Sequence, residues 1–339
     1  MEQGWHAYLG SNTAEGFFGY YNNLQAAAER AVIIKGGPGV GKSTLMKKVA
    51  AHYEEKGLTV HYYHCSGDPD SLDAVFVQEN GFLMADGTSP HVLDPIRPGG
   101  RDGILNLGVC LHEEKLARQM PELDDCYAAV SASYTRAYHY LKAAAAIRAD
   151  SADVYATAFP ADKRRRLQNE LLSLVPENGD GKERHAFLQA ITWKGVVQYP
   201  DHLEAKQVIG LDLPWGMDGD VILQPVWQLA KQRNLGIFCW HDPLEGKKIG
   251  HLQTGDVLFT TAAPGNARLI TPDLDQDLLR AQASRLSFNR AVYDLCLHQA
   301  VEVLAEAKQA HDRLERYYID AMDFGRLQAI TKEVLEELP

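Results

Sequence analysis

The chain has 339 residues, a length that predicts two domains of about 150 residues each. Apolar residues make up 45% of the sequence and charged residues 23%, which excludes a largely disordered or collagen-like chain. The 45 Asp and Glu outnumber the 34 Lys and Arg, and the formal net charge of -11 argues against a general nucleic-acid coat or a binder of anionic membranes.

Cysteine usage and apolar runs indicate the compartment. The five cysteines contain no C-x-x-C pair, so neither a disulfide framework nor a zinc knuckle is predicted. The first residues lack a basic segment followed by an apolar core, and no run of about 20 apolar residues occurs. We therefore expect a cytoplasmic protein without a membrane segment.

In chain order, the first half begins with a β–α–β pattern. Residues 31–34 are a β-branched run, residues 43–56 have helical spacing, and residues 58–64 are again rich in β-formers. A further apolar run, residues 81–85, ends at Asp86. This order predicts the α/β class, with a parallel sheet and helices on both faces.

A glycine-rich segment lies between the first predicted strand and the first predicted helix. Its residues 36–43 fit the P-loop pattern G-x-x-x-x-G-K-[ST]. Glycines let backbone N–H groups approach phosphate oxygens, and the helix N-terminus adds positive potential. We expect Lys42 to contact the β- and γ-phosphates and the Ser43 hydroxyl to bind Mg²⁺. The predicted nucleotide-binding residues are Gly36, Gly37, Pro38, Gly39, Val40, Gly41, Lys42, Ser43 and Thr44.

Aspartates follow the next two predicted strands. Asp86 is expected to be the second magnesium anchor of the P-loop, and the alternative is an Asp that ends its strand with an Asx turn. The acidic loop with Asp68, Asp70 and Asp73 should open at the same carboxyl edge of the sheet. These side chains would hold an acceptor hydroxyl, position the attacking water, or cap the next helix. The predicted catalytic set is Lys42, Asp86 and Asp68.

The second half of the chain repeats the first. Between His6 and Leu24, seven of nineteen positions are identical to the residues 179 positions later. The match resumes at an offset of 176 with Val32-Ile33 over Val208-Ile209. The polar Pro/Gly stretch 176–181 is suited to a linker, so we predict one domain over residues 1–176 and another over 177–339.

Long helical stretches end both halves. Residues 123–173 are Ala-rich and helical, with turn signals near 149–151 and 159–160, and residues 274–338 are helical too. A helix over 286–322 would be about 55 Å long at 1.5 Å per residue, which exceeds a compact domain. We therefore predict that each half is an α/β core followed by a helical hairpin.

The phosphate cradle is absent from the second half. The repeat places Asp218 where Lys42 stands and Trp215 where Gly39 stands. A carboxylate facing a triphosphate is repulsive by several kcal/mol at an effective dielectric constant near about 20, and the indole would occupy the phosphate path. The second half is therefore expected to be a degenerate P-loop domain, a structural or regulatory partner of the first.

Three segments together resemble a known family, a group of uncharacterised bacterial ATPases built of two tandem P-loop halves. They are residues 34–48, 64–73 and 86–91, and the likeness extends over essentially the whole chain. Members usually carry a second Gly-Lys-Ser/Thr loop, and this sequence departs from them there. The resemblance implies ATP binding and brings no established substrate.

The expected function is that of an ATP- and Mg²⁺-dependent P-loop NTPase whose first half alone is active. One alternative is an ATPase whose nucleotide state moves the helices or a partner. Another is a kinase that phosphorylates a small molecule or nucleotide held by the Asp68–Asp73 loop, and a third is a nucleotide-sensing binding module. The base, the substrate, the protein partner and the oligomeric state stay open.

Overall fold

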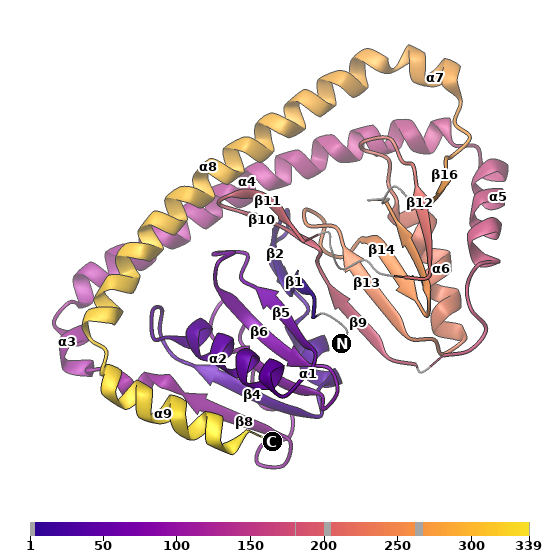
Figure 1. Ribbon diagram of the computed structural model, residues 1–339. Helices are drawn as coiled ribbons and strands as arrows, with labels where there is room; N and C mark the ends of the chain where they lie inside the picture. Colours follow the sequence, from indigo (N-terminus) through magenta and orange to yellow (C-terminus); the bar gives the residue numbers. More distant parts are fainter. Residues whose placement is uncertain (1–3, 180, 200–204, 262–266, 339) are drawn as a thin grey trace.

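The computed structural model describes residues 4–179, 181–199, 205–261 and 267–338, so that position 180 of the predicted linker lies outside it. Its architecture is mixed α/β, with two six-stranded sheets and a pair of long helices that spans both (Figure 1). None of the helices in these ranges is both long enough and apolar enough to cross a membrane.

The first sheet belongs to the first half of the chain. Its strands in spatial order are β1 (His6–Tyr8), β5 (Val60–His64), β6 (Leu72–Val77), β7 (Phe82–Asp86), β4 (Arg30–Lys35) and β8 (Asp102–Asn106). The prediction of a parallel sheet is corrected at β6, which runs antiparallel to both of its neighbours. A turn over residues 78–81 joins β6 to β7, and so short a connection permits only an antiparallel pair.

The second sheet has the same topology. Its strands in the corresponding order are β9 (Glu183–Ala186), β13 (Ile237–His241), β14 (Ile249–Thr254), β15 (Val257–Thr260), β12 (Gln207–Leu211) and β16 (Arg268–Ile270). Here β14 is the antiparallel strand. The shared order agrees with the internal repeat of the sequence.

Helices cover the sheets because their apolar residues share one face. Helix α2 (Lys42–Glu55) buries Leu45, Met46 and Val49 against the first sheet, and α6 (Asp220–Gln232) covers the second in the same way. The smaller elements are the hairpins β2–β3 (Gly10–Thr13, Gly16–Gly19) and β10–β11 (Gln189–Thr192, Gly195–Gln198), the helices α1 (Tyr21–Ala27), α3 (Glu113–Ala117) and α7 (Gln276–Ala281), and the 3₁₀ turn Leu107–Cys110.

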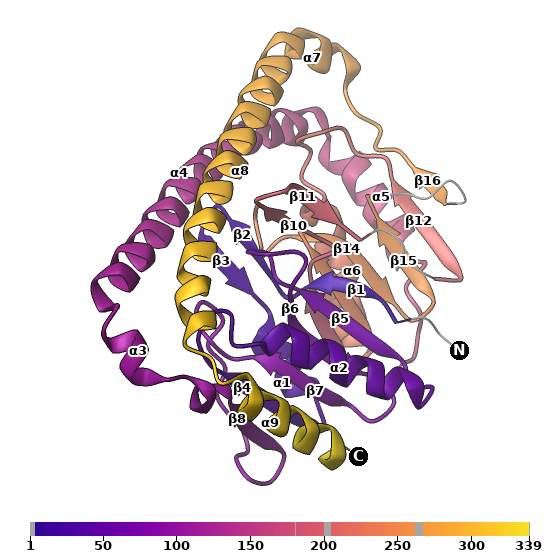
Figure 2. The ribbon, with the colours of Figure 1, turned by 60° about the vertical axis from the view of Figure 1, so that its left-hand side comes forward.

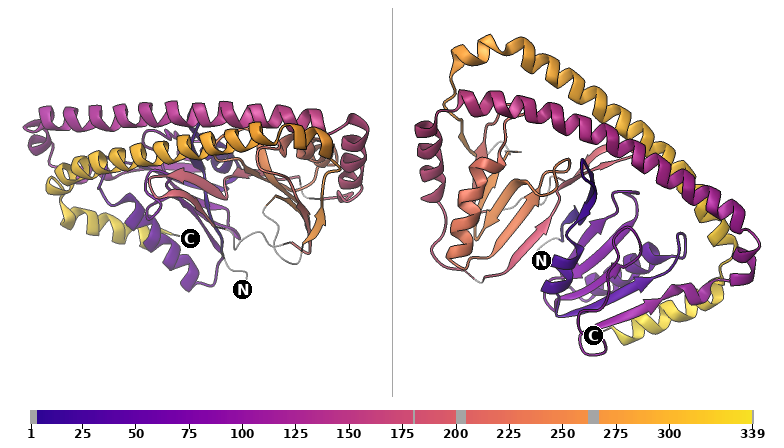
Figure 3. Two further views of the ribbon diagram at one scale, coloured as in Figure 1. Left: turned by 90° about the horizontal axis from the view of Figure 1, so that it is seen from above. Right: turned by 180° about the vertical axis from the view of Figure 1, so that it is seen from behind.

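The two longest helices pair with each other. Helices α4 (Met120–Ala158) and α8 (Ala283–Asp320) lie side by side and antiparallel in every view (Figures 1 and 3). Cross-helix contacts join Tyr127 to Tyr318, Arg136 to Glu306, and Asp150 to Arg285. The predicted hairpin within each half is therefore corrected, because a helix of 39 residues, about 58 Å, needs a partner of its own length.

The turn expected near residues 149–151 is also absent, and α4 continues through it to Ala158. The polar residues there serve the helix pair: Asp150 binds Arg285 and Asn289 of α8, and Ser151 is buried beside Asn289. Polarity at this point reflects a tertiary contact and not a chain reversal.

The long helices carry the short terminal helices to the opposite half. Helix α5 (Ala161–Leu172) buries Leu167 and Leu171 in the core of the second sheet. Helix α9 (Phe324–Glu337) comes from the second half, and its Leu327 packs against the core of the first sheet, near α2 (Figures 2 and 3). Each α/β core is thus completed by a helix from the other half.

The same reciprocity holds where the two sheets meet. The backbones of Tyr8 and Phe187, equivalent residues of the repeat, exchange two hydrogen bonds of 2.9 and 2.8 Å. On one side of this contact lies a half-buried histidine pair, His6 with His64, of which His64 stacks on Tyr199 of the second half and His6 is tilted against the same ring. On the other side the equivalent pair, His185 with His241, stacks on Tyr20 of the first half. The halves are related by an approximate twofold axis.

Candidate functional site

The glycine-rich loop stands where the sequence predicts it, between the end of β4 and the start of α2. Gly39 and Gly41 have φ angles of +69° and +88°, in the left-handed region that favours glycine. Gly41 is also the residue that caps α2, so the loop leads directly into the helix N-terminus. This is the strand–loop–helix order that phosphate binding at a helix N-terminus requires.

Lys42 and Asp86 meet at the mouth of this loop. The Lys42 Nζ atom donates to the carbonyl oxygens of Gly36 and Gly37 at 3.1 and 2.8 Å, and it lies 3.5 Å from Oδ2 of Asp86. Both side chains are only 12% exposed. Strand β7 brings Asp86 there because it pairs in parallel with β4, with Asp86 opposite Ile34. Two members of the predicted catalytic set are therefore neighbours.

The oxygens expected to bind magnesium have partners within the fold. The Ser43 hydroxyl accepts a hydrogen bond of 3.0 Å from the Leu72 N–H. Oδ1 of Asp86 accepts from the backbone N–H and the hydroxyl of Thr88, which is the Asx turn weighed as the alternative. Oδ2 of the same carboxylate faces Lys42. The turn thus orients Asp86 and leaves one oxygen directed to the loop.

The three aspartates of the acidic loop have different surroundings. Asp68 accepts from the Ser71 hydroxyl and lies 3.7 Å from Nζ of Lys308 on α8. Asp70 is exposed and pairs with Lys194 at 2.6 Å. The helix-capping alternative is wrong, because the element that follows this loop is strand β6, and Asp73 lies within that strand.

Asp73 belongs to a buried polar cluster that the sequence did not reveal. Its carboxylate accepts a 2.7 Å bond from the Tyr21 hydroxyl and lies 3.5 Å from Nε2 of His91, whose Nδ1 is 3.1 Å from the carbonyl oxygen of Asp86. Burial alone would raise the pKa of Asp73, but His91 and Tyr21 hold it below the usual value. Burial opposes the charged form of His91 as well, yet Asp73 raises its pKa. Residues far apart in sequence form this cluster, and no motif spacing announces it.

The C-terminal helices of the second half cover the glycine-rich loop. A methyl group at Gly37 would lie 2.5 Å from Cε1 of Tyr318, and one at Gly39 would lie 3.0 Å from Cγ1 of Ile319. Gly41 has the same relation to Leu327 of α9, at 3.1 Å. The side-chain-free loop therefore also allows α8 and α9 to approach closely.

The corresponding loop of the second half is built differently. Asp218, at the position of Lys42, forms a 2.8 Å ion pair with Lys248 and accepts from the Asp220 N–H. The indole of Trp215, which was expected to occupy the phosphate path, packs against Tyr293 and Arg290 of α8. The carboxylate at position 218 thus joins its loop to the connection between β13 and β14.

Helix α4 covers this second loop as α8 covers the first. A methyl group at Gly216 would lie 2.8 Å from Cβ of Ser151. Arg148 binds Asp242 at 2.7 Å, in the place where Lys308 approaches Asp68 in the first half. Each loop region is therefore contacted by a cation from the long helix of the other half.

Comparison with protein families matches residues 19–75 to the family described as nephrocystin 3, N-terminal. The matched segment contains the glycine-rich loop and the acidic loop but covers less than half of the chain. No curated protein and no solved structure matches. The resemblance to tandem P-loop ATPases remains a prediction.

Proposed function

We propose that the first half binds Mg-ATP and hydrolyses it, and that the second half takes part without a nucleotide of its own. The observation that carries the proposal is the meeting of Lys42 and Asp86 at the mouth of a glycine-rich loop that opens α2. Loop N–H groups and Lys42 would hold the phosphates, and Ser43 and Asp86 would hold Mg²⁺, which neutralises charge on the phosphates when bound. The ion pair between Asp218 and Lys248 supports a single site.

Several contacts favour hydrolysis over phosphorylation of a bound acceptor. A kinase would need a carboxylate that is free to accept the proton of the acceptor hydroxyl. Asp68 is engaged by Ser71 and Lys308, Asp70 by Lys194, and Asp73 is buried. The acidic loop is therefore committed to contacts within the fold.

Helices α8 and α9 lie against the glycine-rich loop, and this contact indicates how a bound nucleotide would affect the rest of the molecule. Lys42 now donates to carbonyl oxygens of its own loop, and a bound triphosphate would draw its Nζ away from them. The loop glycines lie directly against Tyr318, Ile319 and Leu327, so a change of loop conformation would alter the packing of α8 and α9 on the loop. We infer that nucleotide binding in the first half is coupled to α8 and through it to α4.

A thermal-shift experiment tests nucleotide binding. Mg-ATP at about 100 times its Kd should stabilise the native chain by about 2.7 kcal/mol, and Lys42→Ala should lose most of this shift. Asp218→Ala is the matched control, because it changes the equivalent residue of the second half and should retain the shift. Calorimetry should give one nucleotide per chain. An unchanged shift in Lys42→Ala, or two equivalent sites, would contradict the proposal.

A further inference from the structure

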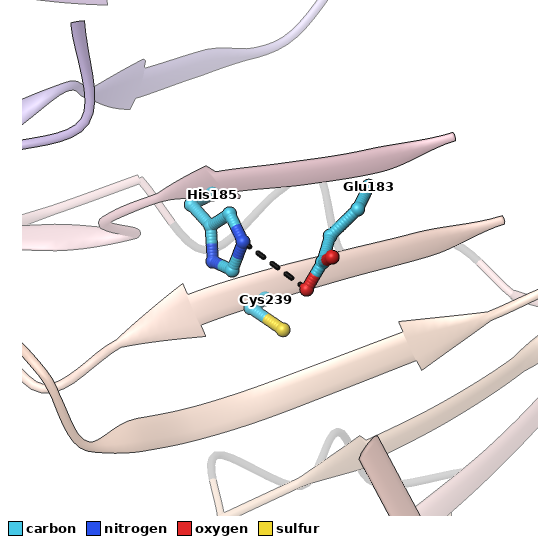
Figure 4. A group of neighbouring side chains, drawn as sticks. All are labelled: Glu183, His185 and Cys239. Carbon is cyan, nitrogen blue, oxygen red and sulfur yellow. Dashed lines mark ion pairs between the residues drawn. The ribbon is translucent and has the colours of Figure 1, made fainter. Parts of the chain in front are cut away.

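Three potential metal ligands gather on the second sheet, away from the glycine-rich loop. Glu183 and His185 are two residues apart on β9 and point to the same face, and Cys239 lies opposite His185 on the neighbouring strand β13 (Figure 4). Nε2 of His185 is 3.3 Å from Oε1 of Glu183. The carboxylate oxygen, the imidazole nitrogen and the Cys239 sulfur all lie within 4.8 Å of one another.

A second imidazole fixes the orientation of His185. Its Nδ1 is hydrogen-bonded to Nε2 of His241 at 2.9 Å, and Tyr20 stacks on both rings. The other ring nitrogen, Nε2, is thereby directed toward Glu183. Metal-bound histidines are generally held in this way, by a hydrogen bond at the nitrogen that does not bind the ion.

Cys239 completes the donor set. Its side chain is buried, and within the described residues no hydrogen bond reaches its sulfur. Burial and the nearby Glu183 carboxylate raise the pKa of this thiol. A cation bound between the two groups would attract both the carboxylate and a Cys239 thiolate, and would so offset the repulsion that opposes formation of the thiolate beside Glu183.

We propose that Glu183, His185 and Cys239 bind one divalent transition-metal ion. One sulfur, one nitrogen and one oxygen donor are the ligands that Zn²⁺ takes, and three protein ligands leave a fourth position open. A thiolate disfavours Mg²⁺ and Ca²⁺, which prefer oxygen. On binding, the Cys239 S–H bond breaks, its proton passes to solvent, and a sulfur–metal bond forms.

Glu183 has two present partners with which the ion would compete. The Trp227 Nε1–H donates to Oε1 at 2.7 Å, and Nζ of Lys231 lies 3.4 Å from Oε2. The Lys231 side chain is 44% exposed, so it can turn into solvent when a dication neutralises the carboxylate. The Trp227 bond can persist, since a carboxylate oxygen has more than one lone pair.

The site is specific to the second half. The repeat and the strand registers place Gly4, His6 and Tyr62 of the first half at the equivalent positions. Only the histidine is shared, and it also has a histidine partner, His64. The first half therefore supplies a built-in comparison.

Cobalt titration of the full chain tests this proposal without reference to nucleotide. Co²⁺ bound to a thiolate gives a near-ultraviolet charge-transfer band, which should saturate at one ion per chain and disappear on addition of Zn²⁺. Cys239→Ser should abolish the band, and Glu183→Gln should weaken binding. His241→Gln, which removes only the orienting ring, should weaken binding by about 10- to 100-fold. Cys110→Ser and His6→Gln are the controls, because they change another buried cysteine and the equivalent histidine, and both should keep the band.

The outcomes separate a metal site from a buried polar cluster. Absence of a saturable band in the native chain, or its persistence in Cys239→Ser, would overturn the proposal. Far-ultraviolet circular dichroism checks that each variant is folded. If Cys239→Ser does not fold, Glu183→Gln and His241→Gln decide the question, because unchanged cobalt affinity in both would also overturn it.

Discussion

At the scale of single residues, Gly87 bears on the rate of the proposed reaction. Many hydrolytic P-loop enzymes carry a glutamate after the magnesium-binding Asp, where it orients water. Here Gly87 follows Asp86, and a methyl group on it would lie 2.3 Å from Cγ2 of Ile33. The packing of β7 on β4 therefore leaves no room for any side chain at this position.

We predict slow basal hydrolysis for this reason. A bound triphosphate without a positioned nucleophile turns over poorly, so we expect less than about 1 s⁻¹ from the protein alone. Phosphate release by purified protein measures this rate, with Asp86→Ala as the variant that reports contamination. Rapid release that is lost in Asp86→Ala and unaffected by any added molecule would show a site already complete.

One histidine of each pair, His64 and His241, also makes the stability depend on pH. Burial lowers the pKa of His64 to about 4 and that of His241 to about 3, well below the usual value near 6.5. Between these values the unfolded chain binds a proton that the folded chain does not. Stability therefore falls as pH decreases through this window, whereas His91, with its raised pKa, contributes in the opposite direction.

We predict that the unfolding free energy decreases from pH 6.5 toward pH 4. Each neutral buried histidine contributes a slope of about 1.4 kcal/mol per pH unit once the unfolded chain is fully protonated. Urea unfolding at several pH values gives this slope, and His64→Gln should reduce it. His298→Gln, at a side chain 67% exposed, should leave it unchanged. Equal slopes in all three proteins would contradict this origin.

At the scale of elements, the sequence predicted the strands and helices whose bounds depend on the residues within them and at their ends. Strands β4, β5 and β7 and helices α2 and α8 lie within a few residues of their predicted bounds, because each has its own apolar period and end signals. Strand β6 was missed, since its sequence follows an acidic loop that suggested a helix cap. The partner of α4 could not be predicted, because the apolar face of a long helix shows that another element packs against it but does not identify that element.

The candidate site also has a part that the sequence predicted and a part that it did not. Motif and strand order predicted the neighbourhood of Lys42 and Asp86, which follows from two adjacent parallel strands. The Asp73–His91–Tyr21 cluster and the cover by Tyr318 come from segments distant in sequence, and only the tertiary structure brings them together.

The contact between α4 and the second glycine loop gives a prediction at this scale. Gly216 and Gly195 both have positive φ angles, +85° and +100°, so alanine is strained at either position. Only Gly216 also meets a neighbour, Ser151, whereas nothing lies within 4 Å of a methyl group at Gly195. Gly216→Ala should therefore cost at least about 1 kcal/mol more than Gly195→Ala in urea unfolding. An equal loss of unfolding free energy in the two variants would show that α4 moves aside for the methyl group without a loss of stability.

At the scale of the whole molecule, the exchange of α5 and α9 separates position in sequence from position in space. Leu171 belongs to the first half by sequence but is fully buried in the core of the second sheet. Leu327 of the second half packs on the first sheet.

We predict reciprocal effects on hydrogen exchange. Leu171→Ala, a large-to-small change at a buried site, should cost about 2–5 kcal/mol and should reduce amide protection first in β12 and α6. Leu327→Ala, its counterpart on α9, should reduce protection first in β4 and α2. Exchange measured by mass spectrometry on peptides of each half distinguishes the two patterns. Loss of protection confined to the half that carries the substitution in sequence would contradict the exchanged arrangement.

The exchanged helices have a consequence for how such a chain could diverge. Two copies of one repeat would make the same contacts as a symmetric dimer, and every substitution would then appear twice, once in each loop. Fusion into one chain makes the encounter of the halves intramolecular, at an effective concentration in the millimolar range, so assembly no longer depends on dilution. Fusion also allows a substitution in one repeat without the same substitution in the other. Lys42 can persist while Asp218 occupies the matching place, an asymmetry that no dimer of identical chains can have.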